Sequence, residues 1–159
     1  MAANQLPLDY EDLEFKVQEE NWNDYEIQGG IRLLARSILV KVMRRKALTP
    51  EALELGSASQ DVFITLASDE PRGPPSPLTA EEVSGRVKID KIRMRIVRSN
   101  ELWNTYEIVR TGDRIRTKLS VIDVYRVPNR FDKFGYPALI ITSGVQVAFE
   151  RRAEGALTP

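Results

Sequence analysis

The chain of 159 residues contains neither cysteine nor histidine. These absences exclude disulfide bonds, thiolate chemistry, Cys/His zinc sites and every catalytic arrangement that depends on a Ser–His or Cys–His pair. Long apolar segments are also missing, since no stretch approaches the roughly 18 consecutive apolar residues that a membrane-spanning helix needs. Residues 1–20 are polar and acidic, so we expect no secretory signal, no membrane association and a cytoplasmic location.

Charge is balanced over the whole chain but not along it. The 23 acidic and 23 basic residues cancel, yet residues 1–80 hold 13 acids and 8 bases, whereas residues 81–159 hold 10 acids and 15 bases. A neutral total removes the usual overall attraction to nucleic acid. Sixteen of the bases are arginine, which suits either a thermophilic source or a GC-rich genome.

The two halves of the chain resemble each other. The segment Trp-Asn-Asp-Tyr-Glu-Ile at 22–27 corresponds to Trp-Asn-Thr-Tyr-Glu-Ile at 103–108, and the alignment continues to Arg44 and Arg126 after one extra residue in the second turn. Nine of the 23 positions from 22 to 44 are identical, where chance would give about one or two. We interpret this as an internal duplication.

Flanking segments extend the alignment with apolar residues at every second position, the period of half-buried strands. The upstream alignment joins Leu13, Phe15 and Val17 to Ile92, Met94 and Ile96, and the downstream alignment joins Val62, Ile64 and Leu66 to Val145, Val147 and Phe149. The pattern predicts a mainly all-β fold. Each unit resembles a small five-stranded SH3-like or OB-like barrel, and we expect two of them to pack as a pseudo-twofold dimer. One barrel formed jointly by both copies is the alternative.

The predicted domains are a first β-barrel repeat at 1–70, a proline-rich linker at 71–85 and a second repeat at 86–159. Four prolines between residues 69 and 77 favour an extended linker. Thr79 precedes two acids, which indicates either a short capped helical turn or more linker. A second short helical turn is predicted over residues 48–55, where Pro50 follows Thr49.

The duplicated hairpin motif has two interpretations. Its Trp and Tyr could form a binding platform, but we favour a scaffold in which the Trp is buried and the Asn and Glu hold the turn by hydrogen bonds. Glutamate and arginine flank the turn in both halves, so we expect an ion pair there. The predicted scaffold residues are Trp22, Tyr25, Glu26, Arg32, Trp103, Tyr106, Glu107 and Arg114.

A basic segment opens the second half. Its cations are Arg86, Lys88, Lys91, Arg93, Arg95 and Arg98. Alternation along a strand would place most of them on one face, which suits a nucleic-acid surface. The corresponding first-half segment, residues 9–20, is strongly acidic, so the two strands could instead meet and neutralise each other.

The loop at 129–136 is a second candidate surface, for a protein partner, since hairpin tips that carry aromatic and basic side chains often bind partners. Its candidate contact residues are Arg130, Phe131, Lys133 and Phe134. The alternative is that both rings fold back over the end of the barrel.

Catalysis has little support in the sequence. There is no Gly-rich phosphate loop leading into a helix, and Ser37 and Lys41, four apart on an expected strand, have nothing that marks them as reactive. We therefore predict no enzyme activity, no cofactor and no metal, and a binding or assembly module whose partner is another protein. A nucleic-acid-binding tandem barrel is the alternative, and a carboxylate-based carbohydrate-active enzyme a remote one. The expected state is a pseudo-dimeric monomer or a small homo-oligomer.

Overall fold

The computed structural model describes residues 10–45 and 55–152. Strands dominate this part of the chain, as predicted, and a single short helix, α1 (Ala80–Ser84), lies between the two halves. Within the described ranges no helix is long and apolar enough to cross a membrane. The helical turn predicted over residues 48–55 falls almost entirely outside the described residues.

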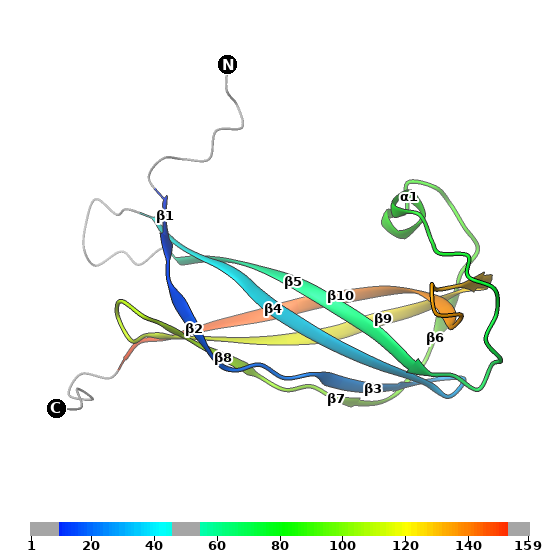
Figure 1. Ribbon diagram of the computed structural model, residues 1–159, viewed down its shortest axis with the longest axis horizontal. Helices are drawn as coiled ribbons and strands as arrows, with labels where there is room; N and C mark the ends of the chain where they lie inside the picture. The colour runs from blue at the N-terminus through cyan, green and yellow to red at the C-terminus, as the bar shows by residue number, and fades with distance from the viewer. Residues whose placement is uncertain (1–9, 46–54, 153–159) are drawn as a thin grey trace, which may run out of the picture.

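Each half of the chain provides five strands. Those of the first half are β1 (Tyr10–Leu13), β2 (Phe15–Glu19), β3 (Asn23–Ile27), β4 (Ile31–Arg45) and β5 (Leu55–Ala67). Those of the second half are β6 (Ile92–Met94), β7 (Ile96–Asn100), β8 (Asn104–Ile108), β9 (Arg114–Phe131) and β10 (Pro137–Glu150). The long strands β4, β5, β9 and β10 run along the length of the molecule (Figure 1).

These strands form two antiparallel five-stranded sheets. In sheet A, β4 pairs with β5 on one side and with β1 and β3 on the other, and β7 pairs with β3. In sheet B, β9 pairs with β10 on one side and with β6 and β8 on the other, and β2 pairs with β8. The two sheets therefore share one pairing pattern, and each includes a strand from the other half of the chain.

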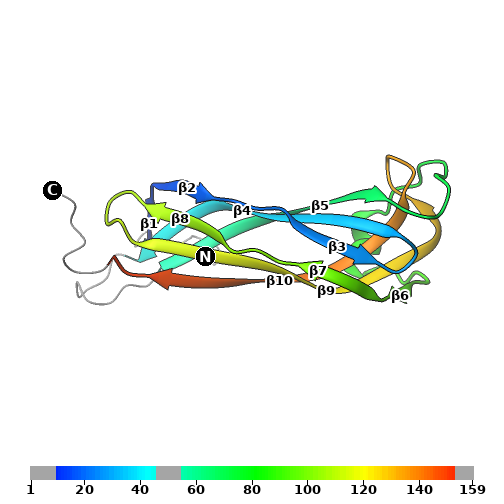
Figure 2. The ribbon, with the colours of Figure 1, turned by 90° about the horizontal axis from the view of Figure 1, so that it is seen from below.

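The strand exchange occurs where a single residue separates two strands. Glu14 separates β1, in sheet A, from β2, in sheet B, and Arg95 separates β6, in sheet B, from β7, in sheet A. Viewed from below, β4 and β5 form one layer and β9 and β10 the other (Figure 2). The crossing segments connect these layers.

The prediction of barrels is wrong, because both sheets are open. A barrel in each half would require its strands to close on one another, but β2 and β7 leave their own half and pair with the other. The apolar side of each sheet is then covered by the opposite sheet, which is the two-layer solution to burying a sheet face.

Two hydrophobic clusters fill the space between the layers, and each draws on both halves. One contains Tyr25, Ile27, Ile31, Leu33 and Ala35 together with Leu119, Val121 and Val124. The other contains Tyr106, Ile108 and Ile115 together with Leu13, Leu39 and Val42. Strands β4 and β9 each run through both clusters. Burial of this apolar surface therefore stabilises the contact between the halves as much as the halves themselves.

Equivalent bulges in β4 and β9 shift the alternation of inward-facing and outward-facing side chains along each strand. The pairing registers skip Val40 in β4 and Ile122 in β9, and both side chains are exposed. An extra residue shifts the alternation of a strand. Ser37 is consequently buried while Lys41 is exposed and lies 3.2 Å from Asp12, so the two candidate residues of a Ser–Lys pair point to opposite sides.

The predicted downstream alignment of the halves is wrong by one residue. Leu33 pairs with Thr65 in sheet A, whereas its counterpart Ile115 pairs with Phe149 in sheet B. Thr65, not Leu66, is therefore equivalent to Phe149. Because a one-residue shift exchanges the two faces of a strand, Val62, Ile64 and Leu66 point away from the core, while Phe63 and Leu55 of the same strand pack against it.

Candidate functional site

The duplicated motif places Asn23 at the junction of the two halves. Its side chain is buried, and its Nδ2 donates to the carbonyl of Leu119 at 2.8 Å. Its Oδ1 accepts from the backbone N–H of Leu102 at 2.9 Å. We predicted that the motif asparagine would hold its own turn, but its backbone partners lie in the other half of the chain.

Asn104 makes the equivalent bonds in the opposite direction. Its Nδ2 donates to the carbonyl of Ser37 at 3.1 Å, and its Oδ1 accepts from the backbone N–H of Asn21 at 2.7 Å. Both asparagines thus satisfy buried backbone groups that the strand ladders leave unpaired. The motif asparagines therefore join the two halves by hydrogen bonds.

The motif tyrosines complete this junction. Tyr25 donates its hydroxyl to Glu101 at 2.7 Å, and Tyr106 donates to Glu20 at 2.9 Å. Burial, and then the hydrogen bond to Glu101, raises the pKa of Tyr25 above its ordinary value. Burial, followed by the hydrogen bond to Glu20, raises the pKa of Tyr106 to about 12. The charged form of either ring is disfavoured because it would lie buried beside a carboxylate.

The motif tryptophans are half-buried rather than fully buried, and cations lie over both rings. The Arg36 guanidinium is 5.5 Å from the ring centre of Trp22 and 2.5 Å from Glu20. At Trp103, the guanidinium of Arg116 and the ammonium of Lys118 lie 4.9 and 5.7 Å from the ring centre. The first site therefore has one cation and one carboxylate, while the second has two cations on one indole and one carboxylate, Glu150, at 3.5 Å from Arg116.

The predicted ion pair between glutamate and arginine across the turn is not formed. Glu26 and Arg32 are register partners, as are Glu107 and Arg114. Arg32 pairs instead with Asp24 at 2.7 Å and lowers the pKa of that carboxyl through a hydrogen bond. The shorter side chain of Asp24 lies on the same outward face of β3 and meets the guanidinium directly.

The basic and acidic segments do not meet, contrary to the hypothesis of mutual neutralisation. β1 pairs with β4 and β2 with β8, whereas β6 pairs with β9 and β7 with β3. The acidic segment finds its counter-charges elsewhere: Glu11 pairs with Arg44 and with Arg110, the latter at 3.2 Å. Charge compensation is intramolecular, but the partners are not the ones predicted.

The predicted basic face is divided between the sheets, because the segment crosses from one to the other at Arg95. Arg93 pairs with Asp123 in sheet B at 2.7 Å, and Arg98 lies 3.7 Å from Glu26 in sheet A. Lys91 lies over the ring of Tyr125 at 4.5 Å. Arg86 and Lys88 are exposed in the segment that follows α1.

The proline-rich segment is bound to the tip of the β9–β10 hairpin. The Ser76 N–H donates to the carbonyl of Phe131 at 3.0 Å, and the Phe131 N–H donates to the Ser76 hydroxyl at 2.9 Å. Gly73 lies so close to the Phe131 ring that a Cβ there would overlap it. Arg72 also lies 4.7 Å from the ring centre of Tyr136.

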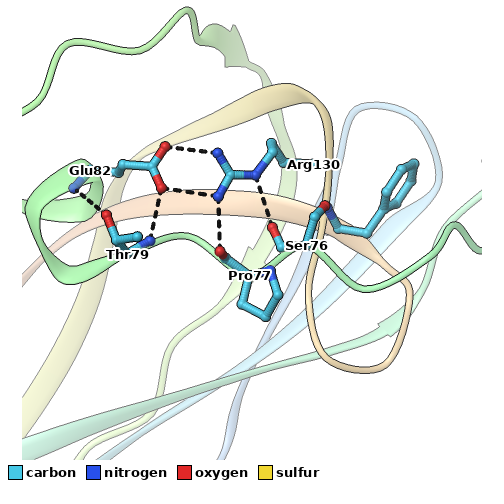
Figure 3. Close-up of polar contacts among 6 residues, drawn as sticks. Ser76, Pro77, Thr79, Glu82 and Arg130 are labelled. Carbon is cyan, nitrogen blue, oxygen red and sulfur yellow. Dashed lines mark hydrogen bonds and ion pairs between the residues drawn. The ribbon is translucent and has the colours of Figure 1, made fainter.

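Arg130 connects this segment to α1 (Figure 3). Its guanidinium donates to the carbonyls of Ser76 and Pro77 and forms a bidentate ion pair with the Glu82 carboxylate, with N–O distances of 2.8 and 3.0 Å. Glu82 also closes a capping box with Thr79, which confirms the predicted helical turn. The hydrogen bond with Arg130, then that with the Thr79 N–H, lowers the pKa of Glu82 to about 2.

Intramolecular contacts therefore occupy much of the predicted hairpin-tip surface. Arg130 and Phe131 are engaged by the chain itself, which favours the alternative in which the Phe131 ring is covered. Phe134 remains 61% exposed, and the Lys133 ammonium lies 5.1 Å from its ring centre. Only these two of the four residues are available to a partner.

The outer face of sheet A carries an apolar stripe. Cross-strand partners Leu34 and Ile64 lie there, with Ile38 and Val62 on neighbouring pairs; Ile64 and Ile38 are each 37% exposed. The edge strand β5 has 13 residues, pairs only with β4 and contains no lysine, arginine or proline. Asp61, its single charged residue, shares a register pair with buried Ser37 and so faces inward.

The outer face of sheet B is basic instead. Arg114, Arg116 and Lys118 alternate along β9 with buried Ile115, Thr117 and Leu119. Arg116 and Lys118 were missed as candidates, although the sequence Arg-Ile-Arg-Thr-Lys-Leu carries the signal as a period of two. Trp103 joins them on this face. The two faces thus differ where the two halves of the sequence differ.

Possible metal ligands are not clustered in the described residues. No three Asp or Glu side chains there are placed to hold a metal ion. No protein-family model matches the chain, and no curated protein or solved structure shows significant similarity to it.

Proposed function

We propose that this protein is a non-catalytic assembly module that pairs with a second copy of itself through strand β5. The observation that carries the proposal is the unprotected edge of sheet A. Soluble proteins normally shield long edge strands with charged side chains, proline or a covering segment. β5 has only inward-facing Asp61 and pairs with β4 alone. Near its end the Leu66 carbonyl accepts from the Tyr136 hydroxyl at 3.1 Å, and the part of the edge before it is the one that would pair with a further strand.

A second copy is the partner that this edge fits best. Two β5 strands related by a twofold axis are antiparallel, so the β5 strands of the two copies can exchange backbone hydrogen bonds across the axis. The outward side chains near the edge, Val62 and Ile64, would continue the apolar stripe into the neighbouring copy. The cations of this face are already compensated, with Arg32 bound to Asp24 and Arg36 to Glu20. Two such faces can therefore approach without repulsion.

The other long edge, β10, supports self-pairing less well. It begins with Pro137 and ends with Glu150, which pairs with Arg116 on a cationic face. Two β10 edges would bring two basic faces together, and like charges opposed at an interface are costly. The outer face of sheet A has no such excess.

We also infer that the chain arose by duplication of one β-rich unit and fusion of a symmetric dimer. Three observations support this origin: the nine identities over 23 positions, the common pairing pattern of the two sheets, and the reciprocal bonds of Asn23 and Asn104. In such a dimer the strand exchange would have joined two chains. The two tandem units then correspond to residues 1–70 and 86–159.

Sedimentation equilibrium of the wild type and two matched variants tests the assembly. Ile64→Lys places a charge on the outer face beside the edge, while Ile122→Lys places the same charge at an exposed position of sheet B. We expect the wild type and Ile122→Lys to be dimers and the dissociation constant of Ile64→Lys to rise at least tenfold. A monomeric wild type at high micromolar concentration, or a dimer unaffected by Ile64→Lys, would contradict the proposal.

A further inference from the structure

A separate surface, the outer face of sheet B, carries a line of cations along β9. Arg114, Arg116 and Lys118 recur every second residue, a repeat of about 6.7 Å in a strand. This repeat is comparable to the spacing of successive phosphates in an extended nucleic-acid strand. The line is straight over this segment because the first bulge of β9 comes later, at Ile122.

Trp103 fixes two members of this line. The indole lies beneath both Arg116 and Lys118, at 4.9 and 5.7 Å from ring centre to cation. Such contacts restrict long side chains that would otherwise lose conformational entropy on binding an anion. The half-buried ring also offers an aromatic surface next to the cations, the combination that single-strand-binding surfaces use.

The charge of this face is positive even after its acids are counted. Lys16, which faces outward with its register partner Glu107, adds a fourth cation, and the acids are Glu107, Glu150 and Glu19, whose register partner Thr105 faces outward. Glu150 lies 3.5 Å from Arg116, and Gln18 donates to Glu107. Within the described chain, Lys118 contacts only the Trp103 ring and Arg114 has no ion pair.

The equivalent positions on sheet A provide an internal contrast. Arg32 corresponds to Arg114 and Arg36 to Lys118, but both sheet A arginines are bound to carboxylates, Asp24 and Glu20. The counterpart of Glu20 is Glu101, which turns inward to Tyr25, Ser120 and the Val121 N–H instead of meeting Lys118. One face is neutralised and its counterpart is left cationic.

We infer that the outer face of sheet B binds the phosphate backbone of single-stranded nucleic acid, with Arg114, Arg116 and Lys118 as phosphate contacts positioned by Trp103. A single strand fits better than a duplex, because the cations form one line along one strand of a sheet. Further along β9, Tyr125 with Lys91 extends the same face, whereas Arg93 on the neighbouring strand is paired with Asp123 at 2.7 Å. Binding there leaves the β5 edge free, so it is independent of self-assembly.

Fluorescence anisotropy with a labelled oligothymidylate of about 16 nucleotides tests this inference, since a single-strand-binding fold covers up to about that length. We compare the wild type with Arg116→Ala/Lys118→Ala and with the matched control Arg32→Ala/Arg36→Ala. Because each lost phosphate contact lowers the salt slope by about 0.7, the first variant should bind at least tenfold more weakly, with a slope smaller by about 1.4. The control should bind like the wild type.

Three results would overturn the inference. The first is a wild type that shows no salt-sensitive binding at micromolar concentration. The second is an equal loss of affinity in the control variant, which would indicate non-specific attraction. The third is full affinity for a polyglutamate peptide without affinity for the oligonucleotide, which would assign the face to an acidic protein segment. Circular dichroism of each variant shows whether the fold is retained, and the substituted side chains lie on outer faces.

Discussion

Replacement of the motif asparagines by alanine tests whether the two halves are joined by buried hydrogen bonds. Asn23→Ala removes the donor to the Leu119 carbonyl and the acceptor of the Leu102 N–H. Asn104→Ala removes the corresponding bonds to Ser37 and Asn21. Both asparagines are 2% exposed, so water cannot readily replace the lost partners.

The expected cost follows from these contacts. A neutral hydrogen bond contributes about 0.5–1.5 kcal/mol net, and a buried group left unpaired costs about 1–3 kcal/mol. Two bonds and at least one buried orphan per site give a loss of about 2–4 kcal/mol for each variant. Since small domains are stable by about 5–15 kcal/mol in total, the double variant should be close to unfolding.

Equilibrium urea unfolding of the two single variants measures these free energies. The control is Asn100→Ala, an exposed position on edge strand β7, which should change stability by less than about 0.5 kcal/mol. A loss below about 1 kcal/mol at both motif positions would refute the reasoning. It would mean that packing alone joins the halves and that the hydrogen bonds are incidental.

Three further outcomes are expected. The pKa values of Tyr25 and Tyr106 in the folded protein lie above the ordinary value of 10, so the native state keeps protons that the unfolded state releases. The free energy of unfolding should therefore be fully present below pH 10 and fall as the pH rises toward 12. Thermal melts of Tyr25→Phe/Tyr106→Phe should lose this alkaline dependence, and an unchanged dependence contradicts the assignment. Arg130→Ala should release the proline-rich segment from the hairpin tip, seen as faster proteolysis between residues 68 and 84, whereas Lys133→Ala, at an exposed neighbour, should not. Residues 1–70 and 71–159, expressed as separate chains, should lack stable structure as monomers but form a complex on mixing, because each sheet needs a strand from the other half. Circular dichroism and sedimentation measure this, and a half that is folded as a monomer would contradict it.

The repeated motif could be located in the sequence, but its partners could not. Trp22-Asn23 and Trp103-Asn104 are evident by alignment, and hairpins follow from their glycine-containing turns. A side chain that bonds its own turn and one that bonds a segment 67 or more residues away leave the same local pattern. The predicted local role was the simpler one, and the tertiary exchange of strands replaced it.

The position of the cationic surface could not be predicted from the sequence either. The cations of residues 86–98 are dense in the sequence and predicted one basic face, yet the crossing at Arg95 divides them between two sheets. Arg116 and Lys118 lie among apolar residues and are less conspicuous. They form the inferred site together with Trp103, which directly precedes β8 and lies beneath them.

The sequence by itself determined the strand content, the similarity of the two halves in sequence and the absence of thiol and imidazole chemistry. Each depends on local preference, composition or internal comparison, all of which are contained in the chain order. The tertiary structure alone decided that the sheets stay open, that β2 and β7 change sheets, and that Val62 and Ile64 of β5 face outward. These features depend on which strand satisfies which backbone edge and on a one-residue register, and long-range pairing settles both.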